Sequence, residues 1–145
     1  MAGSFFTVGR DGQLVILHPF LPAGRVDAML MTGFDAKPNS VTIKSVGLDG
    51  KHREDHLPGN YTVTITFDRN SSALGDFQST LDAAKRRAAA VPTGTIYQYV
   101  NELDGSVSTY VFSEVTFQVT DLGNFKGDDK VTQTLMASAV ERRRV

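Results

Sequence analysis

The 145-residue chain contains no cysteine, which excludes a disulfide framework and a thiolate zinc site. It has no tryptophan, and its longest apolar run, residues 14–17, is far shorter than the ~20 residues of a membrane-spanning helix. The N-terminus lacks the basic and apolar regions of a secretory signal. With 15 basic and 16 acidic side chains, the chain has no overall electrostatic bias toward nucleic acid or membrane. We expect a single domain, residues 1–145, made in the cytoplasm.

Motifs of catalysis are missing as well. The chain has no nucleophile elbow, no phosphate-binding loop and no dinucleotide fingerprint. On a helix, His52 and His56 with Asp55 between them would suit a metal, but the glycines and prolines around them favour a solvated loop. The pair Asp128-Asp129 is more typical of a turn than of a metal site. The sequence therefore predicts no enzyme, no cofactor and no metal.

A strict alternation of polar and apolar residues over positions 60–68 predicts a half-buried strand. The face expected to be buried carries Tyr61, Val63, Ile65 and Phe67, and the opposite face carries Thr62, Thr64 and Thr66. A free-standing protein would more often place Lys or Glu on such a face to block edge pairing. The row of uncharged hydroxyls therefore favours a protein that assembles rather than one that catalyses.

Further strands are expected at residues 14–17, 25–33, 41–46 (with Val41 and Ile43 inward), 95–101, 106–120 and 130–140. The strand over 106–120 is long enough to need a bend near Ser113-Glu114, and its alternation puts Phe112 on the same side as Thr116 and Gln118. Breaks are expected at 36–39 and over the charged connection 47–59, and residues 142–145 are predicted to form a loose tail.

The period changes after residue 70. Apolar residues at helical spacing predict one helix of about 16 residues, capped by Ser71 or Ser72 and ended before Pro92. The inward positions are Leu74, Phe77, Leu81, Ala84 and Ala88. The predicted order is several strands, one helix and then more strands. This order predicts a mainly β (α+β) fold with two packed antiparallel sheets, as a sandwich or barrel, and one flanking helix.

Several short sequence segments, taken in their order along the chain, resemble those of a known family. They are Gly33-Phe34-Asp35, Pro58-Gly59-Asn60-Tyr61, Phe67-Asp68-Arg69, Ser72 to Phe77, Asp104 to Ser108 and Lys126 to Gln133. From residue 33 to 138 the chain resembles the tail tube proteins of contractile or long-tailed bacteriophages. The resemblance implies a virion protein: six copies form a ring, sheets join across subunits, and rings stack into a tube through which the genome passes without specific binding. It also implies sheath, baseplate and terminator proteins as partners.

Under this resemblance, Thr62, Thr64, Thr66, Thr116 and Gln118 are expected to face the lumen, because short neutral side chains neither grip phosphates nor stack bases. The connection carrying Lys51, His52, Arg53, Glu54, Asp55 and His56 is expected to reach the next subunit or ring, where mixed charges would set register. Phe5 and Phe6, in a possible N-terminal arm (1–12), and Arg142, Arg143 and Arg144, in a possible tail (141–145), are the remaining candidate contacts.

Other interpretations stay open at this point. The same pattern suits a tube initiator, a terminator or a baseplate paralogue. A carbohydrate- or ligand-binding β-sandwich would use Tyr97, Tyr99 and Tyr110 as a platform. A small hydrolase would use His52, His56 and Asp55.

Overall fold

A computed structural model describes residues 6–8, 12–21, 25–27, 31–69 and 72–145. Its elements are β1 (Gly12–Leu17), β2 (Arg25–Asp27), β3 (Met31–Val46), β4 (His52–Asp68), α1 (Ala73–Arg86), β5 (Gly94–Asn101), β6 (Val107–Asp121) and β7 (Thr132–Arg144). The expected break between strands 25–33 and 41–46 is wrong, because β3 runs through it. Residues 28–30 lie outside the described residues.

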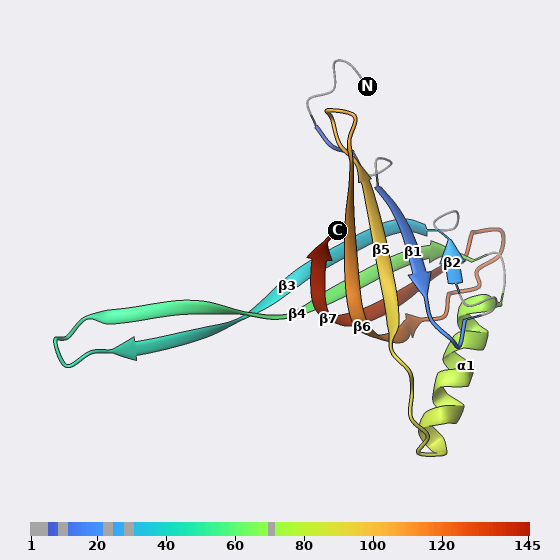
Figure 1. The fold of residues 1–145 in the computed structure, drawn as a ribbon. Helices are drawn as coiled ribbons and strands as arrows, with labels where there is room; N and C mark the ends of the chain where they lie inside the picture. Colours follow the sequence, from blue (N-terminus) through green and yellow to red (C-terminus); the bar gives the residue numbers. More distant parts are fainter. Residues whose placement is uncertain (1–5, 9–11, 22–24, 28–30, 70–71) are drawn as a thin grey trace.

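All seven strands belong to one antiparallel sheet in the order β2-β1-β5-β6-β7-β4-β3. The sheet curls so that β1 and β5 lie across from β3, β4 and β7, with the core between them (Figure 1). The mainly β class with one flanking helix is confirmed. The two expected layers are two parts of one continuous sheet, which ends at β2 and β3 and is not closed into a barrel.

The bend expected in the long strand is present in β6. Ile96 pairs with Phe112 and Gly94 pairs with Val115, so β6 has one extra residue relative to β5. Glu114 takes a positive φ of 51° at this bulge. A bulge reverses which side chains point inward. Phe112 is therefore fully buried in the core, and its expected place beside Thr116 and Gln118 is wrong.

The helix closes one end of the core through Leu74, Phe77, Leu81 and Ala84, as the spacing predicts. Ala88 lies beyond the helix and is exposed. Ser72 is the N-cap residue, but its hydroxyl donates to Asp76 Oδ2 at 2.9 Å rather than accepting a backbone N–H. No helix in the described part of the chain is long and apolar enough to span a membrane.

Residues 40–58 of β3 and β4 form a two-stranded arm that projects away from the body (Figure 1). The sequence predicts a loop over 47–59, which is wrong for most of that stretch: only residues 47–51 turn, and His52 to Pro58 belong to β4. Val41 and Ile43 were expected to be inward, but they are 56% and 49% exposed. Pro38 fits within β3 because β3 is an edge strand.

The expected C-terminal tail is also a strand. Arg142, Arg143 and Arg144 belong to β7 and pair with Phe112, Val111 and Tyr110 of β6. Backbone pairing therefore continues almost to the end of the chain. In the expected N-terminal arm, Phe5 lies outside the described residues and Phe6 is 79% exposed.

Candidate assembly surfaces

A mostly uncharged face covers the outside of β3, β4, β7 and β6. Two rows cross it in register, Lys37-Thr62-Ser138-Thr116 and Asp35-Thr64-Met136-Gln118. Thr66 follows, paired with Gly33 and Thr134, and Thr134 pairs in turn with Asp121 at the end of β6. We call this surface the polar face. The structure thus places the five candidate lumen residues together, on the side of the sheet opposite the core residues Val63, Ile65 and Phe117.

Hydrogen bonds fix the side chains at one end of the polar face. Asn39 donates through Nδ2 to Thr62 Oγ1 at 2.8 Å, and Asn60 donates through Nδ2 to Ser138 Oγ at 2.7 Å. At the β3 edge, Lys37 Nζ lies 3.6 Å from Asp35 Oδ2. The face therefore presents mainly hydroxyls and amides around the exposed Met136, and its two charges at the β3 edge offset each other.

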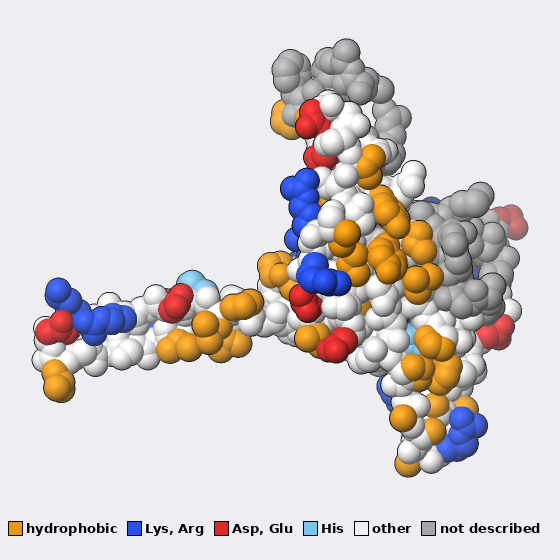
Figure 2. Space-filling model, in the orientation of Figure 1, with side chains coloured by type: hydrophobic (Ala, Val, Ile, Leu, Met, Phe, Trp, Pro, Cys, Tyr) orange, Lys and Arg blue, Asp and Glu red, His pale blue; other side chains and the backbone are white. Residues whose placement is uncertain are grey.

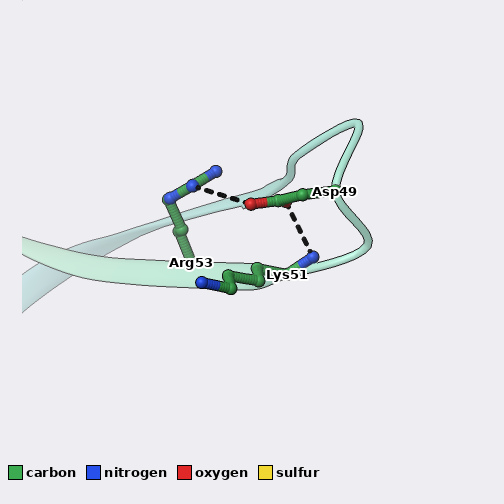
Figure 3. Close-up of polar contacts among 3 residues, drawn as sticks. All are labelled: Asp49, Lys51 and Arg53. Carbon is green, nitrogen blue, oxygen red and sulfur yellow. Dashed lines mark hydrogen bonds and ion pairs between the residues drawn. The ribbon is translucent and has the colours of Figure 1, made fainter.

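The arm ends in a turn organised by Asp49 (Figure 3). The backbone N–H of Lys51 donates to Asp49 Oδ1 at 3.0 Å, and Arg53 Nη2 lies 3.5 Å from Asp49 Oδ2. Gly50 takes a φ of 80°, where a side chain would be strained. Two of the basic candidate residues are thus positioned by one carboxylate at the tip, and the Lys51 side chain extends along the strand.

The two sides of the arm differ in character. One side carries Val41, Ile43 and Leu57 with Asp55 and Arg53, and we call it the apolar side of the arm. The other carries Thr42, Lys44, Glu54, His52 and His56, where His56 Nδ1 lies 3.1 Å from Thr42 Oγ1 and its Nε2 lies 3.8 Å from Glu54 Oε1. His52, His56 and Asp55 thus lie on an open ribbon and are divided between its sides. No group of metal-ligating side chains occurs among the residues that the structure describes.

The three tyrosines of the ligand-platform interpretation are also divided. Tyr97 and Tyr99 lie on the outside of β5, with Val15 beside Tyr97 on β1 and Val111 beside it on β6. Tyr110 faces the opposite side, where the guanidinium carbon of Arg142 lies 4.0 Å from its ring centre. Arg144 Nη2 donates to the buried Ser108 Oγ at 3.1 Å. Two of the candidate arginines therefore anchor β7 to β6.

His18 is a buried polar group that sequence patterning did not single out. Its Nδ1 accepts the Phe20 N–H at 3.0 Å, so its Nε2 carries the proton and donates to the Pro92 carbonyl at 2.9 Å. The ring also makes edge contacts with Phe77 of α1 and Phe117 of β6. Burial lowers the pKa of His18 below its ordinary value. A histidine directly before a proline gives no periodic signal, so only the fold reveals this role.

No protein-family model matches the chain, and no curated protein matches it in sequence. Solved structures do match. A chain in the tube-terminating cap of the anti-feeding prophage has a TM-score of 0.68 and 12% identity, with 100% of this chain and 94% of that chain covered. A chain in the extended sheath-tube complex of PVC, an extracellular contractile injection system, has a TM-score of 0.65 and 10% identity, covering 99% and 94%.

A chain in the tail of an empty GTA particle, computed with C6 symmetry, is a more distant match, with a TM-score of 0.51 and 8% identity over 97% of this chain and 98% of that chain. The near-complete coverage of these structures shows that the present chain has a tail-tube-like fold. The fold expected from the resemblance is therefore confirmed, while the role of each surface is a separate question.

Proposed function

We propose that this chain is a structural subunit of a phage-tail-like tube, with six copies in each ring and rings stacked along the tube. It acts by assembly and not by catalysis, as part of a tail particle whose proteins are made in the host cytoplasm. The observation that carries the proposal is the polar face. A continuous and mostly uncharged surface across four strands, with the core on its other side, suits the wall of a channel.

In this assembly the polar face lines the lumen. Thr62, Thr64 and Thr66 with Thr116 and Gln118 offer neither the cations that hold phosphates nor the rings that stack bases. The genome therefore slides past without specific binding. The ion pair of Lys37 with Asp35 at the β3 edge adds no net charge to this wall.

Ring closure follows from the unpaired sheet edges. The sheet ends at β3 on one side and β2 on the other, so each edge offers backbone groups for pairing with a neighbouring copy. A cyclic arrangement supplies a neighbour at every edge and leaves none exposed. The C6 symmetry of the GTA tail supports six copies per ring.

The arm extends the contact between copies. Its residues Lys51 to His56 project beyond the body, and their mixed charges set orientation at the next subunit or ring. Sheath, baseplate and terminator proteins are the further partners of such a tube, as the PVC sheath-tube complex suggests. Phe6 and Arg143 are candidate contacts outside the arm.

Electron microscopy of the purified full-length protein, at concentrations from micromolar upward, tests the proposal. Rings with a central channel, alone or stacked, are the expected result, and averaging them counts the copies. A protein that stays monomeric at every concentration, also when mixed with preformed tubes of its own system, would contradict a tube role.

A tube-terminating role is the second candidate. The match to a chain in the tube-terminating cap of the anti-feeding prophage covers the whole chain and favours it. The same micrographs separate the two roles, because a tube subunit forms stacks of variable length whereas a terminator forms single rings that stop tube growth.

A further inference from the structure

Two apolar surfaces of the chain do not belong to its core. The first is the apolar side of the arm, Val41, Ile43 and Leu57, all more than 40% exposed. The second lies on the outside of β1 and β5 and comprises the half-buried Val15, Leu17, Tyr97 and Tyr99, with the buried Val111 of β6 at its margin. We call it the outer aromatic face. Figure 2 shows hydrophobic side chains gathered over β5 and β1, and others along the arm.

We propose that the apolar side of one copy's arm seats on the outer aromatic face of a second copy. This inference rests on the proposed tube function and names the surface that receives the arm. The arm cannot reach the outer aromatic face of its own chain, because it projects away from the body (Figure 1). Each chain carries one protrusion and one receiving face, which is the arrangement of a head-to-tail contact that closes rings or builds filaments.

Burial of the apolar side of the arm against another surface would stabilise the arm. A lone two-stranded ribbon is at best marginally stable in water, because it has no third strand or helix to bury its apolar residues. Val41 and Leu57 pair directly across the ribbon, so a flat surface laid on that side buries both together. Tyrosine-rich surfaces are well suited to receive it, since aromatic residues are enriched at protein interfaces.

Charges at the margins of the two surfaces are complementary. Asp55 and Arg53 lie on the apolar side of the arm, opposite Ile43 and Ser45. Beside the outer aromatic face, Arg143 pairs in register with Val111, and its Nε lies 3.8 Å from Glu141 Oε1. One arm orientation brings Asp55 to Arg143 and Arg53 to Glu141, and the reversed orientation sets like charges together.

Cysteine cross-linking tests the contact, because the chain has no native cysteine and every disulfide must come from introduced residues. We would mix two full-length variants, Ile43→Cys on the arm and Tyr97→Cys on the outer aromatic face, under assembling and oxidising conditions. The expected result is a prominent covalent dimer on a non-reducing gel, reversed by reductant. The matched control mixes Ile43→Cys with Thr64→Cys on the polar face and should stay monomeric. Tyr99→Cys replaces Tyr97→Cys if circular dichroism shows that the latter is unfolded.

The outcomes separate this inference from the proposed function. Tubes without the Ile43–Tyr97 cross-link, or with a cross-link only in the control, overturn the inference and leave the tube role standing. Cross-linking without rings or tubes supports the contact and counts against the tube role. A charge reversal gives an independent check: Asp55→Arg and Arg143→Asp should each abolish assembly, and the double variant should restore it. Equal loss in the double variant would contradict the proposed orientation.

Discussion

The guanidinium carbon of Arg142 lies 4.0 Å from the centre of the Tyr110 ring, so the end of β7 is held to β6 by a cation–π contact. We expect Arg142→Ala to lower the free energy of unfolding by about 0.5–1 kcal/mol, the range of such contacts at exposed sites. Urea denaturation of the monomer measures the change. Arg143→Ala is the matched control and should stay within about 0.5 kcal/mol of the parent protein, because its ion pair with Glu141 is exposed. Equal effects of the two variants would contradict a specific role for Arg142.

The buried histidine predicts an acid-sensitive fold. Burial lowers the pKa of His18 in the folded state below the ordinary 6.5, so between these two values the unfolded chain binds a proton that the folded chain does not. Stability should therefore fall as the pH drops below about 6.5, with a slope of at most about 1.4 kcal/mol per pH unit from this group. The measurement is urea unfolding between pH 8 and pH 5.

His18→Gln should remove that part of the slope, at the cost of lower stability at pH 8. The control replaces both His52 and His56 by Gln, and it should keep the slope because both side chains lie on the exposed arm. If the His18→Gln variant keeps the full slope, the acid sensitivity comes from other groups.

Gly59 allows the close approach of β4 to β3 where the arm leaves the body. A Cβ atom there would meet the backbone carbonyl oxygen of Asn39, which cannot move aside as a flexible side chain would. Gly59→Ala should cost about 1–3 kcal/mol in thermal or urea unfolding. In α1, Gly75 has open space around it, so Gly75→Ala should instead stabilise by about 0.5–1 kcal/mol. If Gly59→Ala leaves the free energy of unfolding unchanged, the two strands can move apart at this junction without cost.

The arm should be needed for assembly and not for folding. Replacing residues 43–55 by Asn-Gly joins Thr42 to His56, which already face each other across the ribbon, through a two-residue hairpin turn. We expect an unchanged melting temperature, because the removed residues are exposed apart from the half-buried Gly47, and we expect no tubes by electron microscopy. As a control, replacing only residues 47–51 by Asn-Gly joins Val46 to His52. This variant should still allow tubes, because it loses only Lys51 of the candidate contact residues and keeps His52 to His56. If the variant that lacks residues 43–55 forms tubes of normal length, the arm is not needed for assembly.

A lysine on the polar face should convert a neutral channel wall into one that holds nucleic acid. Thr64 points away from the core, so Thr64→Lys should change monomer stability by no more than about 0.5 kcal/mol. In assembled tubes it should create binding of DNA that weakens steeply with salt. Thr64→Ser is the control and should bind no more than the parent protein. If tubes of the Thr64→Lys variant do not bind DNA at low salt, the polar face does not line the lumen.

Much of this fold could be predicted from local pattern, and the failures have identifiable causes. Alternation over 60–68 identified the buried Val63 and Ile65 because β4 has one face on the core there. The same alternation misled at Val41 and Ile43, since it cannot tell a strand face on the core from a face of a ribbon that projects from the body. Pro38 was taken as a break because the position of β3 at the sheet edge becomes known only from the pairing.

Long-range contacts explain the other differences. Three consecutive arginines are typical of a solvated tail, and only the partners Tyr110 and Ser108, more than thirty residues earlier in the chain, reveal that residues 142–144 form a strand. The bend near Glu114 was predicted from length alone, but its effect on Phe112 needed the register with β5. The five candidate lumen residues share one face of the sheet because one side of β4 and the later part of β6 follow a simple period of two.

The strands that build the arm are the strands that carry Asp35, Lys37 and the threonines of the polar face. A pull on the tip of the arm is therefore transmitted along paired backbone into that face, through one register shift between Pro38 and Ser40 and without an intervening loop. In the proposed assembly, a force that a neighbouring copy exerts on the arm would therefore reach the polar face along two continuous strands.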